Sequence, residues 1–158
     1  MLNETVGAEL ARRYEELGAK VAELASPLSE EQFWRKPFVF GNSFGHLVLH
    51  LTGNLNYYIG AEVAGTGYVR DRDREFSEAA RPPQHEVLQR FIDAVMMVAQ
   101  TARVQSEKDW GAPYVALREE TAGNRFNIFL RCATHLHHHV GQMMYLQFAL
   151  TSGAPSRP

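Results

Sequence analysis

RCATHLHHHVGQMMY, residues 131–145, holds four of the chain's seven histidines within five consecutive positions. His135 and His139 are four residues apart, so on an α-helix their side chains lie one above the other on the same face. The same spacing recurs at His46 and His50, in a mostly apolar stretch that reads FGNSFGHLVLHLTGNLNYYIG over residues 40–60. Metal sites in helical bundles are built from inward-facing side chains on neighbouring helices. We therefore expect one imidazole of the earlier pair to join His135 and His139 around a divalent metal.

The other long segments also predict helices. Apolar residues recur at spacings of three and four over residues 3–25, and a second helix is predicted from Asn42 or Ser43 to about residue 64. A third helix is predicted from about residue 87 to 102 and a fourth from about 124 to 150. Residues 68–83 have neither helical nor strand periodicity and predict a long crossover, while no alternating run predicts a sheet. The predicted fold is all-α, a four-helix bundle with a long crossover between its second and third helices.

Between the first two helices, Ser29 and Gln32 have the spacing of a capping box and predict a short helical turn. Three aromatic residues follow closely, and we expect Trp34, Phe38 and Phe40 to fill one end of the core.

Length and composition fit one helical domain over residues 1–158, with residues 152–158 expected to be a disordered tail. The formal charge of -2 gives no reason to expect nucleic acid or an anionic membrane as a partner. The first residues do not resemble a signal peptide, and no apolar run approaches the roughly 18 residues of a membrane span, so a cytoplasmic location is expected. The one cysteine, Cys132, is expected to be buried and to fill space.

Helical geometry separates the histidines of the fourth helix. With His135 at zero, His139 falls at about 40° and Gln142 at about -20°, whereas His137 lies at about 200° and His138 at about -60°. His135, His139 and Gln142 therefore share the apolar face, His137 points away from it, and His138 is marginal. Three neutral imidazoles would leave an open coordination position, which is typical of catalytic zinc sites.

Other interpretations of these residues are open. A lone histidine on an apolar face is commonly a core residue bonded to a backbone carbonyl, although several buried rings would each need such a partner. Spacing does not choose between His46 and His50, although His50 is nearer the middle of its helix. Asn54 and Gln142 have the spacing to orient ligands, but either side chain could equally bind the backbone.

The chain resembles the DinB-like superfamily of metal-dependent hydrolases and thiol transferases. The resemblance rests on HLTGN at residues 50–54, on the histidines of HLHHHVGQ at 135–142, and on AGTGYVRDRDREF at 64–76, and with the helix order it covers most of the chain. It implies a four-helix bundle whose metal ligands are His50, His135 and His139. The neighbouring His137 and His138 are not part of the family's pattern, which leaves open a ligand set that uses His138.

The resemblance also implies a cofactor, partners and a reaction class. Zinc or nickel is the expected ion, with iron or manganese as alternatives, and the protein is expected to form a homodimer. The expected substrate is a small molecule, and some relatives transfer low-molecular-weight thiols such as bacillithiol or mycothiol to electrophiles. The metal would act as a Lewis acid, lowering the pKa of a bound water or binding a thiol as thiolate.

No general base is assigned, because no Asp or Glu has a fixed short spacing from the ligand histidines. Arg70, Arg72 and Arg74 could attract an anionic substrate, but interleaved acidic residues favour a solvated, self-paired loop. Arg131 lies nearer the histidine face and is the better anion-binding candidate. Two alternatives to an enzyme are a non-catalytic metal-binding module and a structural bundle whose histidines belong to the core.

Overall fold

Helices make up most of the structure, a computed structural model that describes residues 2–77 and 81–152. Residues 153–158 of the expected tail lie outside the described part. The helices are α1 (Leu2–Ala25), α2 (Glu30–Trp34), α3 (Phe44–Leu55), the π-helix η1 (Asn56–Ala61), α4 (Arg72–Glu75), α5 (Gln84–Arg103), α6 (Glu107–Gly111) and α7 (Arg125–Thr151). The predicted helical character is thus confirmed, with one small addition. Strands β1 (Pro113–Tyr114) and β2 (Gly123–Asn124) form a short antiparallel pair.

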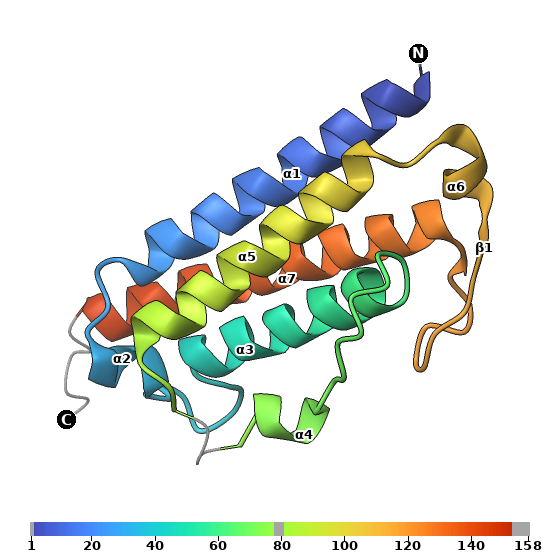
Figure 1. Cartoon of the computed structure of the whole chain (residues 1–158). Helices are drawn as coiled ribbons and strands as arrows, with labels where there is room; N and C mark the ends of the chain where they lie inside the picture. Colours follow the sequence, from blue (N-terminus) through green and yellow to red (C-terminus); the bar gives the residue numbers. More distant parts are fainter. Residues whose placement is uncertain (1, 78–80, 153–158) are drawn as a thin grey trace.

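The four long helices lie side by side along the molecule (Figure 1). Helix α1 packs on α5 and α7, and α3 packs on the same two helices. In Figure 1, α3 and α5 run in one direction, while α1 and α7 run in the other. The core is built mainly from the apolar faces of these four helices, and its largest fully buried side chains are Tyr14, Phe33 of α2, Phe44, Phe91 and Phe129. None of the helices in the described ranges is both long enough and apolar enough to cross a bilayer.

Side-chain caps fix where the two histidine-bearing helices begin. The Ser43 hydroxyl accepts a hydrogen bond from the backbone N–H of His46 at the start of α3. The Asn124 side chain does the same for Asn127 at the start of α7. Each cap satisfies a backbone donor that has no partner within its helix, so the phase of the helix is set from its first turn. The predicted capping box of Ser29 is also present, at α2.

The second predicted helix continues past α3, but not as an α-helix. Backbone N–H groups of Glu62 and Ala64 bond to carbonyls five residues earlier, at Tyr57 and Ile59, which is the wider π-helical pattern. Within this turn Tyr58 is buried, and its backbone carbonyl accepts a hydrogen bond from the Tyr114 hydroxyl at 2.9 Å. The π-helix therefore ties α3 to the loop that precedes α7.

Two further expectations need correction. Trp34 is 6% exposed and lies in the core, but Phe38 and Phe40 are 42% and 74% exposed. Their rings stack on each other instead, with centroids 5.6 Å apart, because Phe33 and Phe44 already fill that end of the core. The crossover, expected to lack helix, contains the single turn α4, which is too short to give a periodic sequence pattern.

Replacing Tyr14 with phenylalanine is expected to lower the free energy of unfolding by about 1 kcal/mol, the usual net value of a buried hydrogen bond. The fully buried Tyr14 hydroxyl donates to the Phe129 carbonyl at 2.6 Å and so links α1 to α7. Urea unfolding measures the loss. Tyr145→Phe, at an exposed position of α7, is the matched control, and an equal loss in both variants would contradict the assignment.

Candidate metal centre

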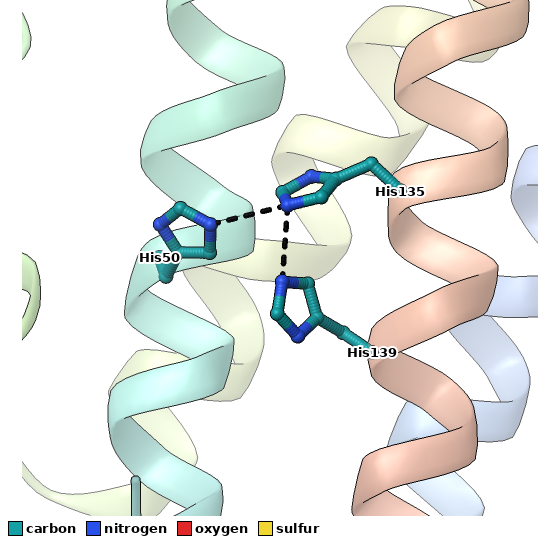
Figure 2. Close-up of side chains that lie close together, drawn as sticks. All are labelled: His50, His135 and His139. Atoms are coloured by element: carbon teal, nitrogen blue, oxygen red, sulfur yellow. Dashed lines mark hydrogen bonds between the residues drawn. The ribbon is translucent and has the colours of Figure 1, made fainter. Parts of the chain in front are cut away.

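His50 of α3 and His135 and His139 of α7 point their rings at one another (Figure 2). The Nε2 atom of His135 is 3.3 Å from Nε2 of His50 and 3.0 Å from Nε2 of His139. One ring nitrogen of each lies within 4.8 Å of the other two. In the described part of the chain, no other three His, Cys, Asp or Glu side chains bring potential ligand atoms together in this way.

The His50 ring is held from behind by an ion pair. Its Nδ1 lies 2.9 Å from Oε2 of Glu75, and Arg70 donates to both oxygens of that carboxylate, at 2.7 and 2.9 Å. Burial alone would raise the pKa of Glu75, but the hydrogen bonds from His50 and Arg70 and the Arg70 charge outweigh it and lower the pKa. An ionised carboxylate only accepts hydrogen bonds, so Nδ1 of His50 carries the proton. The Nε2 lone pair therefore faces the other two histidines.

A comparable contact fixes His139. Its Nδ1 lies 2.7 Å from Oε1 of Gln142, an oxygen that can only accept. The amide nitrogen of Gln142 lies 3.2 Å from Nε2 of His138, which agrees with this orientation of the amide. His139 therefore also carries its proton on Nδ1 and presents Nε2 as a lone pair. Gln142 thus contacts a candidate ligand, which is one of the two alternatives left open for it by the sequence.

His135 is the ring that lacks a comparable partner. Its Nδ1 is buried and has no hydrogen-bond partner among the described residues. Burial and the neighbouring imidazoles lower the pKa of His135 to about 3, and burial outweighs the Gln142 hydrogen bond to lower that of His139 to about 4. At neutral pH both rings are uncharged, which is the form that binds metals. A neutral His135 can donate from Nε2 to one of its two neighbours only, so at least one lone pair at this point has no donor. A cation meets that need, and the donor set fits a divalent ion.

His46, the alternative to His50, has both ring nitrogens engaged elsewhere. Its Nδ1 accepts from the Ser43 hydroxyl at 2.6 Å, and its Nε2 donates to the backbone carbonyl of Ser77 at 2.9 Å. The ring is fully buried and packs edge-on against Trp34. His46 is therefore a core histidine of the kind considered as the general alternative, and it has no nitrogen left for a metal.

The other histidines and the other polar candidates lie outside the cluster of three. His85, His137 and His138 are exposed. Asn54 is buried, but no hydrogen bond joins its side chain to a histidine of the site, and its Oδ1 has no partner among the described residues. The expected role of Arg131 in anion binding is not supported, because its guanidinium bonds to Glu119, at 2.5 Å, and to Thr121. These partners come from the loop before α7, whose path the sequence does not reveal.

Cys132 is buried, as expected, and its pKa is raised because burial disfavours the thiolate. A protonated, enclosed thiol is a poor nucleophile. Any sulfur that reacts at this centre has to come from a bound molecule.

The contact of Glu75 and Arg70 with the site was not identified from the sequence. The RDRDRE run predicts a solvated, self-paired loop, and Arg70 and Glu75 do pair, but their side chains are only 9% and 6% exposed. The one local clue is that Arg70 and Glu75 are the outermost charges of the RDRDRE run. Nothing in that run shows which of its charges faces α3.

An apolar cleft of about 370 Å³ adjoins His139, between α7 and residues 38–47. Phe38, Phe40, Leu47 and Tyr145 contribute apolar walls, and His139 and Gln142 line it as polar groups. A volume of this size suits a small molecule or one arm of a larger one. The exposed Phe38–Phe40 pair, which the sequence placed in the core, thus borders a cavity beside the candidate ligands.

Acidification is expected to destabilise the metal-free protein. The pKa values of His135 and His139 lie at about 3 and about 4 when folded, against an ordinary value of 6.5 for the unfolded chain. Between these values the unfolded state binds more protons than the folded state. The contribution of these two rings to the free energy of unfolding is therefore complete above about pH 6.5 and is lost as the pH drops toward 4. Thermal unfolding with chelator at pH 7.5, 6 and 5 measures the slope. His135→Ala removes one of the two groups and should flatten the slope; a wild-type Tm that does not change would refute the prediction.

The sequence matches a known protein family over a range that contains the histidine cluster. The family model of the DinB superfamily matches residues 13–143, a range that includes the three histidines and Glu75. Searches of curated proteins and of solved structures found no match. The match covers most of the chain and agrees with the resemblance seen in HLTGN and HLHHHVGQ. This chain belongs to the DinB superfamily.

Proposed function

We propose that the protein binds one divalent metal ion through the Nε2 atoms of His50, His135 and His139. The observation that carries the proposal is the convergence of these atoms, with separations of 3.0 and 3.3 Å along the two contacts of His135. On His50 and His139, hydrogen bonds from Nδ1 hold the ring in the tautomer that a metal ligand needs. Zinc and nickel, the ions that the family resemblance implies, are among those that imidazole ligands suit, and iron and manganese are alternatives.

From this site together with membership of the DinB superfamily, whose relatives the sequence resembles, we infer a metal-dependent hydrolase or a transferase of low-molecular-weight thiols. Bound at three imidazoles, a divalent ion supplies Lewis acidity and a position for water or thiolate. The chain's own residues hold the ligands and shape the cleft beside His139, whose walls suit the apolar part of a small substrate. For thiol transfer the sulfur belongs to a cosubstrate, because Cys132 is buried and protonated.

We also infer that the four long helices form the four-helix bundle of the family, with residues 68–83 as the crossover between α3 and α5. We infer in addition that the protein forms a homodimer, as the family resemblance implies. Exposed apolar residues on α7, among them Leu130, Met144 and Phe148, lie near one line of the helix and offer a face for a second copy. Sedimentation of the purified protein measures the oligomeric state.

A non-catalytic metal-binding module makes the same ligand prediction, and a structural bundle predicts no metal at all. Elemental analysis of the purified protein, followed by chelation and reloading with zinc or nickel, distinguishes a metal-binding protein from a structural bundle that binds no metal. About one equivalent of metal, and a Tm that falls with chelator, are expected from the proposal. Turnover in a screen of thiols with electrophiles and of hydrolase substrates, lost on chelation and recovered on reloading, distinguishes an enzyme from a module. A protein that binds no ion and whose Tm ignores chelator would refute the proposal.

A further inference from the structure

A three-residue segment at the end of α4 contacts both histidines of α3. The Glu75 carboxylate bonds to His50, the Phe76 ring lies against the His50 ring with centroids 4.9 Å apart, and the Ser77 carbonyl bonds to His46. His46 and His50 are one helical turn apart, so the segment follows α3 along its surface. The crossover is thereby attached to α3 at the candidate metal site.

Gly53 provides the space for this contact. A Cβ atom placed on Gly53 would lie 2.0 Å from Oε1 of Glu75 and 2.8 Å from its Cδ. Glycine inside a helix costs roughly 0.5–1 kcal/mol relative to alanine, so a close approach is a physical reason for its presence. Gly53 lies three residues after His50, on the same side of α3. A side chain at this position would force the carboxylate to move from the place where it contacts the His50 ring.

Arg70 fixes the carboxylate from its other side. Its Nε donates to Oε1 and its Nη2 to Oε2, and the guanidinium lies over the Tyr58 ring at 5.6 Å from the centroid. A two-pronged contact of this kind fixes the plane of the carboxylate as well as its position. The Nη2 atom also lies 3.4 Å from Nδ1 of His50, a proximity that follows from their shared partner Oε2. One oxygen of Glu75 therefore faces His50 and the other faces Gly53.

We propose that Glu75 is the positioning residue of the metal centre, acting through His50 in the space left by Gly53 and held by Arg70. Its carboxylate keeps the His50 proton on Nδ1 and fixes the rotation of the ring, so that Nε2 points to His135 and His139. This rests on the proposed function in one respect, namely that His50 is a metal ligand. Carboxylates that bond to the outer nitrogen of a ligand histidine commonly strengthen metal binding about 10–100-fold.

The test compares Glu75→Gln with Asp73→Asn. Both variants neutralise a carboxylate of α4, but the Asp73 side chain is exposed and forms none of these contacts. The dissociation constant for zinc, measured by competition with a chelating dye, is expected to rise about 10–100-fold in Glu75→Gln and to stay at the wild-type value in Asp73→Asn. Equal affinities in Glu75→Gln and wild type would overturn the proposal.

A second readout does not involve metal. Nitrogen-15 NMR of the imidazoles in metal-free protein reports the tautomer of each ring, and wild-type His50 is expected to be protonated on Nδ1. Glu75→Gln is expected to give a mixture of tautomers at His50 while His46, held by Ser43 and Ser77, is unchanged. A His50 tautomer that is the same in both proteins counts against Glu75. If wild type binds no metal, the proposed function fails, whereas this readout still decides the role of Glu75.

Gly53→Ala is a second variant for the same test, for use if Glu75→Gln does not fold. It keeps the carboxylate but places a methyl group where Oε1 lies, so the Glu75 carboxylate has to move. The same loss of zinc affinity and the same mixing of tautomers are expected. A mixed His50 tautomer with wild-type zinc affinity would show that the contact is dispensable for metal binding and would overturn the proposal.

Discussion

Replacing His135 with alanine is expected to abolish stoichiometric metal binding. Of the three histidines, His135 stands in the middle, because its Nε2 contacts those of both His50 and His139. Two imidazoles from different helices would then remain, and they lack the third donor of the site. Loss of a ligand should cost more than the about 10–100-fold that follows from disturbing a group outside the coordination shell.

His137→Ala is the matched control, because His137 lies two residues away on α7 and its side chain is exposed. Elemental analysis and dye competition on both variants measure the effect, with circular dichroism as the check on folding. His137→Ala is expected to bind one equivalent, as wild type does. If His135→Ala retained full stoichiometry and affinity, the three-histidine site would be wrong.

The largest loss of stability is expected from Phe129→Ala, at about 3–5 kcal/mol. The ring is fully buried and packs edge-on against Trp110, at 5.1 Å between centroids, and against Tyr14, at 6.5 Å. Phe129 thus joins α1, α6 and α7 at one point. A cavity opens there on truncation, because the surrounding helices relax only in part.

Urea unfolding of metal-free protein gives the difference, and Phe126→Ala is the control. Phe126 also contacts Trp110 but is 39% exposed, so a loss of about 1–2 kcal/mol is expected. Phe129 is no part of the site, so zinc at about 100 times its dissociation constant should restore about 2.7 kcal/mol in Phe129→Ala, as in wild type. Equal losses in the two phenylalanine variants would contradict the role given to Phe129.

The positions of the helices, and which α7 histidines lie on the apolar face, could be predicted because both depend on local periodicity. His135, His139 and Gln142 share a face by helical geometry alone, and the described structure places all three on one side of α7. The beginning of α3 could be predicted at Asn42 or Ser43 because capping is also local, and the structure has Ser43 as the cap. The fourth helix was predicted to begin at about residue 124, and the structure shows Asn124 as its cap.

The choice of His50 over His46 could not be made from spacing, because it depends on contacts from a distant segment. Glu75 is 25 residues from His50 along the chain, and Ser77 is 31 from His46. The crossover that carries them has no periodic pattern to place it in space. The exposure of Phe38 and Phe40 could not be predicted either, because it depends on which aromatic rings occupy the core, and these are Phe33 and Phe44.

The π-helical turn at Asn56–Ala61 lies directly after the segment that carries His46 and His50. Insertion or deletion of one residue in this turn would rotate the residues that follow it, while the two histidines before it keep their orientation toward α7. Such a shift would also move the Tyr58 ring that lies under the Arg70 guanidinium. The turn and the crossover can therefore vary only together with the carboxylate that supports the His50 imidazole.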